Sequence, residues 1–257
     1  MGGPSLEGRV VLVTGAASGI GEATARRLAR EGARLALVDI QGDALKAVAE
    51  SLGDSAVAIV ADLLDDAAAD AVVDEAVSAF GSLHGVVNSA GVLETMHVEE
   101  LTRASYDKVM GINVRGPLFL TQAALPHLSA GSSIVFVASG NAVLASPNGS
   151  VYAASKGALV SLVKGLTADL APRGIRVNAI SPGPIVTPLL SAALADPEVK
   201  ASLEQGVPAG RLGTPEEVAE LALFLVTDAS SYVYGASFAV DGGTTAVWSP
   251  AAPGAES

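Results

Sequence analysis

Short apolar runs rich in β-branched residues recur along the chain between longer segments with a helical pattern. Because neighbouring positions within each run are apolar, the runs are typical of parallel strands that helices cover on both faces. The predicted strands are Arg9–Thr14, Arg34–Asp39, Ala56–Val60, Gly85–Asn88, Ser133–Ser139, Arg176–Ile180 and Ser237–Val240.

The segments between these runs supply helices. Gly19–Glu31 has an amphipathic pattern that Gly32 ends. Thr214–Glu217 is a capping box with proline in its first turn, ahead of the apolar stretch Val218–Val226. Repeated strand–helix units of this length predict an α/β fold with a doubly wound, parallel, seven-stranded, Rossmann-like sheet.

No linker divides the chain, so residues 1–257 are expected to form a single domain. Two segments stand outside the strand–helix alternation. Pro184–Leu212, bracketed by prolines and glycines, is predicted to be a substrate lid, and residues 249–257 are predicted to be a flexible tail.

Composition and charge argue against several classes of partner. Half of the residues are hydrophobic and 16% are charged, as in a packed globular enzyme. A net charge of −12 without a run of Lys or Arg disfavours nucleic acid and anionic membranes, and we interpret the acidic surface as a solvated one. The absence of Cys and the three scattered His predict no metal site. With no signal-peptide pattern and no apolar stretch near ~18 residues, cytoplasmic localisation is expected.

A glycine-rich loop, Thr14–Gly21, joins the first strand to the first helix. Gly15 permits a tight turn, Gly19 lets an anion approach the backbone, and Gly21 lets the helix pack closely on the strand. Free N–H groups at the helix start favour a pyrophosphate. Asp39 ends the second strand about 20 residues further on, where a carboxylate binds ribose hydroxyls. The alternatives are an ordinary glycine-rich turn and an exposed strand-end carboxylate.

Three polar residues suggest proton-transfer chemistry. Tyr152 and Lys156 are four residues apart on a predicted helix, so they share one face. A tyrosine that works near pH 7 needs its pKa of about 10 lowered by about 3 units, and a nearby ammonium in a desolvated site supplies much of that. Ser139 ends the fifth strand at the edge where open α/β sheets bind ligands. The ordinary alternatives are a surface Tyr–Lys pair and a turn serine.

Asn113 lies between two glycines and interrupts an otherwise apolar helical pattern. Such a local conflict is expected at functional sites, although a satisfied buried asparagine is the plain alternative.

A set of motifs follows in order along the chain: Thr14–Gly21, Asp62, Asn88–Gly91, Asn113, Ser139, Tyr152 with Lys156, Pro182-Gly183 through Thr187, and Val240–Gly243. With these motifs the chain resembles, from about Leu6 to Gly243, the short form of the short-chain dehydrogenase/reductases. The resemblance implies that the single domain, residues 1–257, is a dinucleotide-binding and catalytic domain. Two positions depart from the family pattern: Ser89 stands where a second asparagine is usual, and Ala138 or Gly140 where a second serine is frequent. Neither position has a catalytic role in the family.

The resemblance implies an oxidoreductase that interconverts a secondary alcohol and a ketone. Tyr152 would transfer the proton, while Lys156 would bind the nicotinamide ribose and lower the tyrosine pKa. Ser139 would orient the substrate oxygen, and Asn113 would anchor a water in a proton relay. The implied cofactor-binding residues are Gly15, Ser18, Gly19, Ile20, Gly21, Asp39, Asp62, Leu63, Asn88, Ala90, Gly91, Tyr152, Lys156, Pro182, Gly183, Ile185 and Thr187.

Individual cofactor roles also follow from the resemblance. Asp62 would bond the adenine amino group, and Thr187 would hold the carboxamide. Because Asp39 is followed by Ile40 rather than by a basic residue, NAD is the expected cofactor.

Other functions remain open. One is a 3-oxoacyl-carrier ketoreductase, which typically prefers NADPH and basic surfaces near the pocket. Others are a non-catalytic dinucleotide-binding sensor and a nucleotide-sugar epimerase or dehydratase, although the latter would be expected to have evenly spaced glycines and a larger C-terminal domain.

The resemblance implies a small alcohol or ketone as the substrate. The expected pocket segments, Gly140–Val151 and Pro184–Leu212, are mostly small and apolar, with Asn141 and Asn148 as the visible polar groups. This composition suits an uncharged alcohol better than a carboxylate. Glu94 and His97 could face the substrate or be solvated loop residues.

The stretch Val151–Leu170 is apolar or small around most of its circumference, which is typical of a helix buried on two sides. Gly157 and Ala158 would allow a partner to approach closely. We therefore expect a homo-oligomer, a tetramer as in the resembled family.

Overall fold

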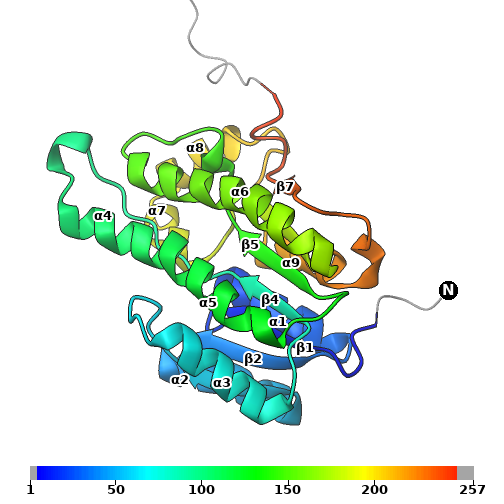
Figure 1. Ribbon diagram of the computed structural model, residues 1–257. Coiled ribbons are helices and arrows are strands. Elements are labelled where there is room, and N and C mark those ends of the chain that lie inside the picture. Colours follow the sequence, from blue (N-terminus) through cyan, green and yellow to red (C-terminus); the bar gives the residue numbers. More distant parts are fainter. Residues whose placement is uncertain (1–4, 248–257) are drawn as a thin grey trace, which may run out of the picture.

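Seven parallel strands form one sheet between two layers of helices in the computed structural model, which describes residues 5–247 (Figure 1). The strand order is β3-β2-β1-β4-β5-β6-β7, so the chain starts in the middle of the sheet and winds outward in both directions. The strands are β1 (Val10–Thr14), β2 (Arg34–Asp39), β3 (Ala56–Val60), β4 (Gly85–Asn88), β5 (Ser133–Val137), β6 (Arg176–Pro182) and β7 (Ser237–Val240).

Helices cover both faces of the sheet. α1, α2 and α9 pack on one face, while α3, α5 and α6 pack on the other and α4 rests against α6 (Figure 1). The helices are α1 (Gly19–Arg30), α2 (Gly42–Leu52), α3 (Ala68–Phe80), α4 (Arg103–Met110), α5 (Gly116–Ala124), α6 (Ser150–Leu170), α7 (Ser191–Leu194), α8 (Pro197–Gln205) and α9 (Pro215–Val226).

The central strands explain why the apolar runs are continuous. In β1, Val11 and Val13 point into the core beneath α1 and α9, while Val10 and Leu12 point into the core beneath α3 and α5. Successive side chains of a strand point to opposite faces, so a strand covered on both sides needs an apolar residue at every position. The predicted α/β fold and its doubly wound, seven-stranded parallel sheet are confirmed.

The structure differs from the prediction in the burial of the two edge strands and in the carboxyl ends of β5 and β6. β3 and β7 have a neighbouring strand on one side only, and their outer faces are partly open, with Val60 52% exposed. β5 ends at Val137 rather than at Ser139, because the Ser139 side chain accepts a hydrogen bond from the Asn141 backbone N–H and begins a turn. β6 continues to Pro182.

The residues that predict helix ends in the sequence lie at or near helix ends in the structure. Thr214 and Glu217 form the predicted capping box: the Thr214 N–H donates to the Glu217 carboxylate at 2.9 Å, and the Glu217 N–H donates to the Thr214 hydroxyl. α1 ends one residue earlier than predicted, at Arg30, and Gly32 adopts a left-handed conformation (φ 87°).

The segment Pro184–Leu212 folds into the short helices α7 and α8, and a bridge between Ile185 and Gly213 joins its ends. The predicted tail, residues 249–257, lies outside the described residues. Within residues 5–247, the structure contains no helix that combines the length and the apolar character needed to cross a bilayer.

Candidate active site

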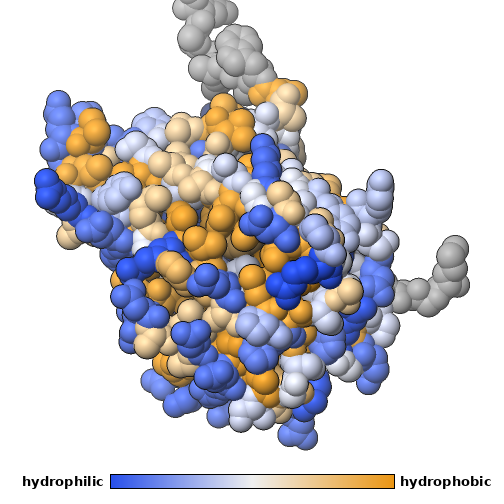
Figure 2. Space-filling view, in the orientation of Figure 1, coloured by the Kyte–Doolittle hydropathy of each residue, from blue (hydrophilic) through white to orange (hydrophobic). Residues whose placement is uncertain are grey.

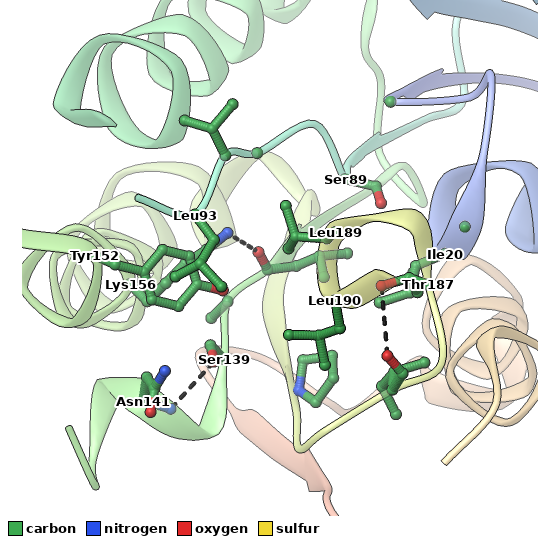
Figure 3. Close-up of a pocket in the computed structure, with 18 of the residues that line it drawn as sticks. Ile20, Ser89, Leu93, Ser139, Asn141, Tyr152, Lys156, Thr187, Leu189 and Leu190 are labelled. Atoms are coloured by element: carbon green, nitrogen blue, oxygen red, sulfur yellow. Dashed lines mark hydrogen bonds between the residues drawn. The ribbon is translucent and has the colours of Figure 1, made fainter. Parts of the chain in front are cut away.

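A cavity of about 730 Å³ lies at the carboxyl edge of the sheet (Figure 3). Its walls come from the carboxyl ends of all seven strands and the segments that follow them, from Gly15 after β1 to Thr245 after β7. β1 and β4 are neighbours from which the chain leaves in opposite directions, and such a switch point is where open α/β sheets bind their ligands.

Glycines shape the loop between β1 and α1. Gly15 has a positive φ of 67°, and a Cβ there would lie 2.9 Å from the Ala90 backbone. A Cβ on Gly21 would lie 2.1 Å from the Gly15 carbonyl oxygen, so α1 packs against the loop as predicted. The Thr14 hydroxyl accepts hydrogen bonds from Ser89 N–H and Ala90 N–H at 3.0 Å each. The loops after β1 and β4 are thereby held together.

Two carboxylates border the nucleotide end of the cavity. Asp39 accepts hydrogen bonds from the backbone N–H groups of Ala17 at 3.1 Å and Gln41 at 3.0 Å, which fixes its carboxylate beside the glycine loop. Asp62 is exposed and accepts a bond from Leu64 N–H at 2.9 Å. Both side chains therefore lie at ends of strands that face the cavity.

Most of the predicted cofactor-binding residues line this cavity. Asn88 is the exception: it is buried, and its Nδ2 donates to the Thr121 hydroxyl at 3.2 Å. Within the described part of the chain, its Oδ1 makes no hydrogen bond. The predicted residues that line the cavity are Gly15, Ser18, Gly19, Ile20, Gly21, Asp39, Asp62, Leu63, Ala90, Gly91, Tyr152, Lys156, Pro182, Gly183, Ile185 and Thr187.

Asn113 lies in a π-helical turn, residues 111–115, between α4 and α5. This irregularity is the local conflict that the sequence predicts, since π-helical turns often occur at functional sites. Its Oδ1 accepts from Val92 N–H at 2.8 Å, and its Nδ2 donates to the Val92 carbonyl and the Ser155 hydroxyl at 3.0 Å each. The side chain thus ties the loop after β4 to α6, as a satisfied buried asparagine does, and its part in a proton relay stays a prediction.

Tyr152 and Ser139 face the cavity from α6 and from the turn after β5 (Figure 3). Burial raises the pKa of Tyr152, and the interaction with the Ser139 hydroxyl lowers it. The pKa of Tyr152 is therefore raised rather than lowered as expected, because burial has the larger effect. Ser139 keeps its hydroxyl hydrogen available, since its oxygen accepts the bond from Asn141 N–H.

Lys156 is a buried ammonium beneath the tyrosine. Its Nζ donates to the Val137 carbonyl at 2.9 Å and lies 5.8 Å from the centroid of the Tyr152 ring. Burial lowers the pKa of Lys156 to about 8. A Cβ on Gly91 would lie 3.2 Å from this Nζ, so glycine leaves the ammonium reachable from the cavity.

Some lining residues were not predicted. Leu93 and Thr95 line the cavity, whereas Glu94 pairs with Lys108 at 2.6 Å. Leu93 and Thr95 could have been predicted from their position just after the carboxyl end of β4. Thr245 also lines the cavity, in the turn after β7, two residues beyond the motif Val240–Gly243. Asn141 lines the cavity as expected, whereas Asn148 and His97 are exposed and lie outside it.

The donor set fits a dinucleotide. The glycine loop presents backbone N–H groups at the start of α1, where an anion is favoured, and Asp39 offers acceptors for ribose hydroxyls. No cluster of three or more His, Asp or Glu that could hold a metal ion occurs in residues 5–247.

Comparisons with known proteins agree with this geometry. Residues 15–245 match a family model described as enoyl-(acyl carrier protein) reductase. The chain is 40% identical over 250 residues to a cis-4-hydroxycyclohexanecarboxylate dehydrogenase of Sinomonas cyclohexanicum, covering 95% of this chain and 100% of that one. It is 39% identical over 245 residues to a D-threitol dehydrogenase of Mycolicibacterium smegmatis, covering 93% of this chain and 94% of that one.

A solved structure is similar over the same length. The 3-ketoacyl-(acyl-carrier-protein) reductase from Brucella melitensis, complexed with NADH, superposes with a TM-score of 0.88 at 37% identity, covering 94% of this chain and 100% of that one. The chain belongs to the short-chain dehydrogenase/reductase family. As a short-chain dehydrogenase/reductase, it is an oxidoreductase by family, and this family binds a nicotinamide dinucleotide.

Replacing the buried ammonium tests its cost to folding. Lys156→Met is expected to raise the free energy of unfolding near pH 7 by about 1–3 kcal/mol, because each pKa unit corresponds to about 1.4 kcal/mol and the lost Val137 bond offsets about 1 kcal/mol. The folded pKa of about 8 lies below the ordinary 10.5. The cost of the charge is therefore fully present below pH 8 and disappears as the pH rises to 10.5.

Urea unfolding at a series of pH values measures this difference. The stability of the parent protein should approach that of Lys156→Met as the pH rises through this window. Lys164→Met, which removes an exposed lysine from the same helix, is the control and should show no such convergence. A stability difference independent of pH would contradict the account.

Proposed function

We propose that this protein is an NAD-dependent oxidoreductase that interconverts a secondary alcohol and a ketone. The observation that carries the proposal is the position of Ser139, Tyr152 and Lys156 on one cavity that continues to the glycine loop and Asp39. The related dehydrogenases of Sinomonas and Mycolicibacterium support a reaction at a carbinol carbon.

The side chains have distinct tasks in the proposed reaction. The nicotinamide, when bound, supplies or accepts the hydride. In ketone reduction the Tyr152 O–H donates its proton to the carbonyl oxygen, and in alcohol oxidation the tyrosine oxygen accepts the hydroxyl proton. The Ser139 hydroxyl donates a hydrogen bond to the same substrate oxygen and holds it beside Tyr152. The Lys156 ammonium binds the ribose and stabilises the tyrosine in its deprotonated form.

The sensor alternative has less support. Placing a lysine beneath a buried tyrosine costs folding free energy, since burial lowers the pKa of that lysine to about 8. A protein that only binds a dinucleotide has no use for this arrangement.

The carrier-linked ketoreductase has the support of the Brucella structure, but the pocket surroundings differ from the expectation for it. α8, which borders the cavity, carries Glu198 and Glu204 and is preceded by Asp196, against the single base Lys200. An excess of acidic residues on this helix repels an acidic carrier protein, so we favour a free small molecule.

The segment Pro184–Leu212 is proposed to be the substrate lid. Leu189, Leu190 and Leu203 from this segment line the cavity. The bridge between Ile185 and Gly213 holds the two ends of the segment together, so α7 and α8 between them could move as a unit.

The proposed tyrosine role has a direct test. Tyr152→Phe should lower kcat by about 10²–10⁴-fold, because it removes the transferable proton of a positioned acid and little else. The affinity for NADH, measured by its fluorescence, should stay close to that of the parent. Tyr232→Phe, at a 98% exposed position, is the control and should be fully active. Residual activity above about a tenth in Tyr152→Phe would contradict the role.

NAD preference rests on the surroundings of Asp39. Its carboxylate is fixed beside the glycine loop, and Lys156 is the only basic residue among the described residues that line the cavity. The 2′-phosphate of NADP would place like charges in contact, which costs about 4 kcal/mol at about 4 Å and an effective dielectric of about 20, before solvent and counterions reduce it. Even a third of this energy corresponds to a difference of about tenfold in kcat/KM between the two cofactors.

We therefore expect kcat/KM to be at least about tenfold higher with NADH than with NADPH. The double variant Asp39→Ala with Ile40→Arg should lower this ratio or invert it, because it removes the repelling charge and adds an attracting one. Ile40 is 62% exposed, so arginine fits there. Steady-state kinetics with both cofactors measure the effect. Comparable efficiency of the parent with NADPH would show that Asp39 does not face the ribose.

We propose a homo-oligomer, and a tetramer in particular, on the evidence of α6. Its buried stripe contains Leu159 and Val163, and its opposite face is an exposed row of small residues that includes Ser161 and Gly165. Figure 2 shows hydrophobic residues on the side of the molecule that α5 and α6 form, where Phe119 is 49% exposed. Two copies could pack closely through such small residues.

Sedimentation analysis at micromolar concentration should therefore show a species larger than a monomer. Ser161→Arg, in the middle of the exposed face of α6, should shift the population to smaller species, because the long charged side chain prevents close packing. Ala47→Arg, at an exposed position of α2 on the other side of the sheet, is the control. A parent protein that sediments only as a monomer would refute the proposal.

A further inference from the structure

The cavity is charged at one end only. Its charged lining residues among those described are Asp39, Asp62 and Lys156. Asp39 ends β2 and Asp62 follows β3 at the nucleotide end. The ammonium lies beneath Tyr152, where it donates to the Val137 carbonyl and, in the proposed function, to the ribose. In the described residues, the wall on the substrate side of Tyr152 therefore contains no charged side chain.

That wall is mainly aliphatic. Figure 3 shows Leu189 and Leu190 across the cavity from Ser139 and Tyr152. A hydrocarbon substituent gains free energy against such a surface, whereas a charged group there would lose its hydration without gaining a partner. The apolar side chains of the wall include Leu93, Leu144, Leu189, Leu190, Leu203 and Val207.

Asn141 is the polar group closest along the chain to Ser139 on this wall. Its Oδ1 accepts a hydrogen bond from the Ser146 hydroxyl at 3.0 Å. Its Nδ2 makes no hydrogen bond with the described residues, so it can donate one to a second oxygen of the substrate. An amide is a neutral donor and supplies no charge to balance an anion.

Two bases in segments next to the cavity lining are already paired. Lys108 contacts Glu94, which lies between the lining residues Leu93 and Thr95, at 2.6 Å. Arg211 contacts Glu217 at 2.6 and 2.9 Å through two of its nitrogens. Neither base lines the cavity, and acidic residues outnumber Lys200 on and next to α8. An anionic substituent that extended to these segments would meet paired bases and an excess of acidic groups.

We propose that the substrate is an uncharged secondary alcohol or its ketone, with no carboxylate, phosphate, sulfonate or ammonium on the part that enters the cavity. This inference rests on the proposed function. The larger hydrocarbon substituent packs against the aliphatic wall on the substrate side of Tyr152. Any second oxygen of the substrate is neutral and accepts a hydrogen bond from Asn141. The site then selects against substrates that are charged on the part that enters the cavity.

A matched pair of ketones tests the proposal. With NADH as cofactor near pH 7, ethyl 4-oxocyclohexanecarboxylate should be reduced with a kcat/KM at least about tenfold higher than that of the free carboxylate, because only the carboxylate must be buried as an ion. A free acid that is reduced as well as its ester, or better, would overturn the proposal.

A charge introduced into the wall gives the reverse test. Leu190→Lys should raise the ratio of acid to ester efficiency at least about tenfold, and added salt should weaken this gain. Val199→Lys places the same cation in the same segment at an exposed position that does not line the cavity, so its ratio should equal that of the parent. An unchanged ratio in Leu190→Lys would count against the assignment of this wall.

Different results would contradict the proposed function and the substrate proposal. If neither ketone is reduced, nor any other secondary alcohol or ketone turned over, the proposed function is contradicted. Binding of the same pair to the protein–NADH complex, followed by NADH fluorescence, then decides the substrate inference without turnover. Tighter binding of the ester supports it, and equal or tighter binding of the acid overturns it.

Discussion

The burial of one ammonium group beneath one phenol determines much of this structure. Lys156 needs an acceptor that water no longer provides, and the Val137 carbonyl supplies it at 2.9 Å from the end of β5. Gly91 leaves space beside the ammonium, and Asn113 holds the loop that contains Gly91 against α6. This burial lowers the pKa of Lys156 to about 8, and the reaction proposed for Tyr152 depends on the positive charge that the lysine keeps near pH 7.

The sequence predicts those parts of the fold that arise from local pattern or from covered surfaces. Strands such as β1 were predicted because helices cover both of their faces, and α9 because its capping box is local. The exposed outer faces of β3 and β7 depend on strand order, which no local pattern encodes. Residues directly after strand ends were predicted for the site, whereas Asn88 was misplaced because a strand end does not show which way a side chain points.

Side-chain environment separates the two ends of the cavity. At the nucleotide end, glycines, backbone N–H groups and the Asp39 carboxylate offer polar contacts. At the other end, leucines such as Leu190 surround the reacting groups and leave Asn141 as a neutral donor. Water is excluded more readily from the second environment, which strengthens the hydrogen bonds that Ser139 and Tyr152 make with a substrate oxygen.

Transfer of deuterium from the cofactor tests the central claim most directly. The protein is incubated with ethyl 4-oxocyclohexanecarboxylate and NADH that carries deuterium at the reactive carbon of the nicotinamide, and the product is examined by mass spectrometry and NMR. The account predicts an alcohol with deuterium on the carbinol carbon, formed by the parent protein and, at most in trace amounts, by Tyr152→Phe. NADH binding without deuterium transfer to this ketone or to any other carbonyl compound would contradict it.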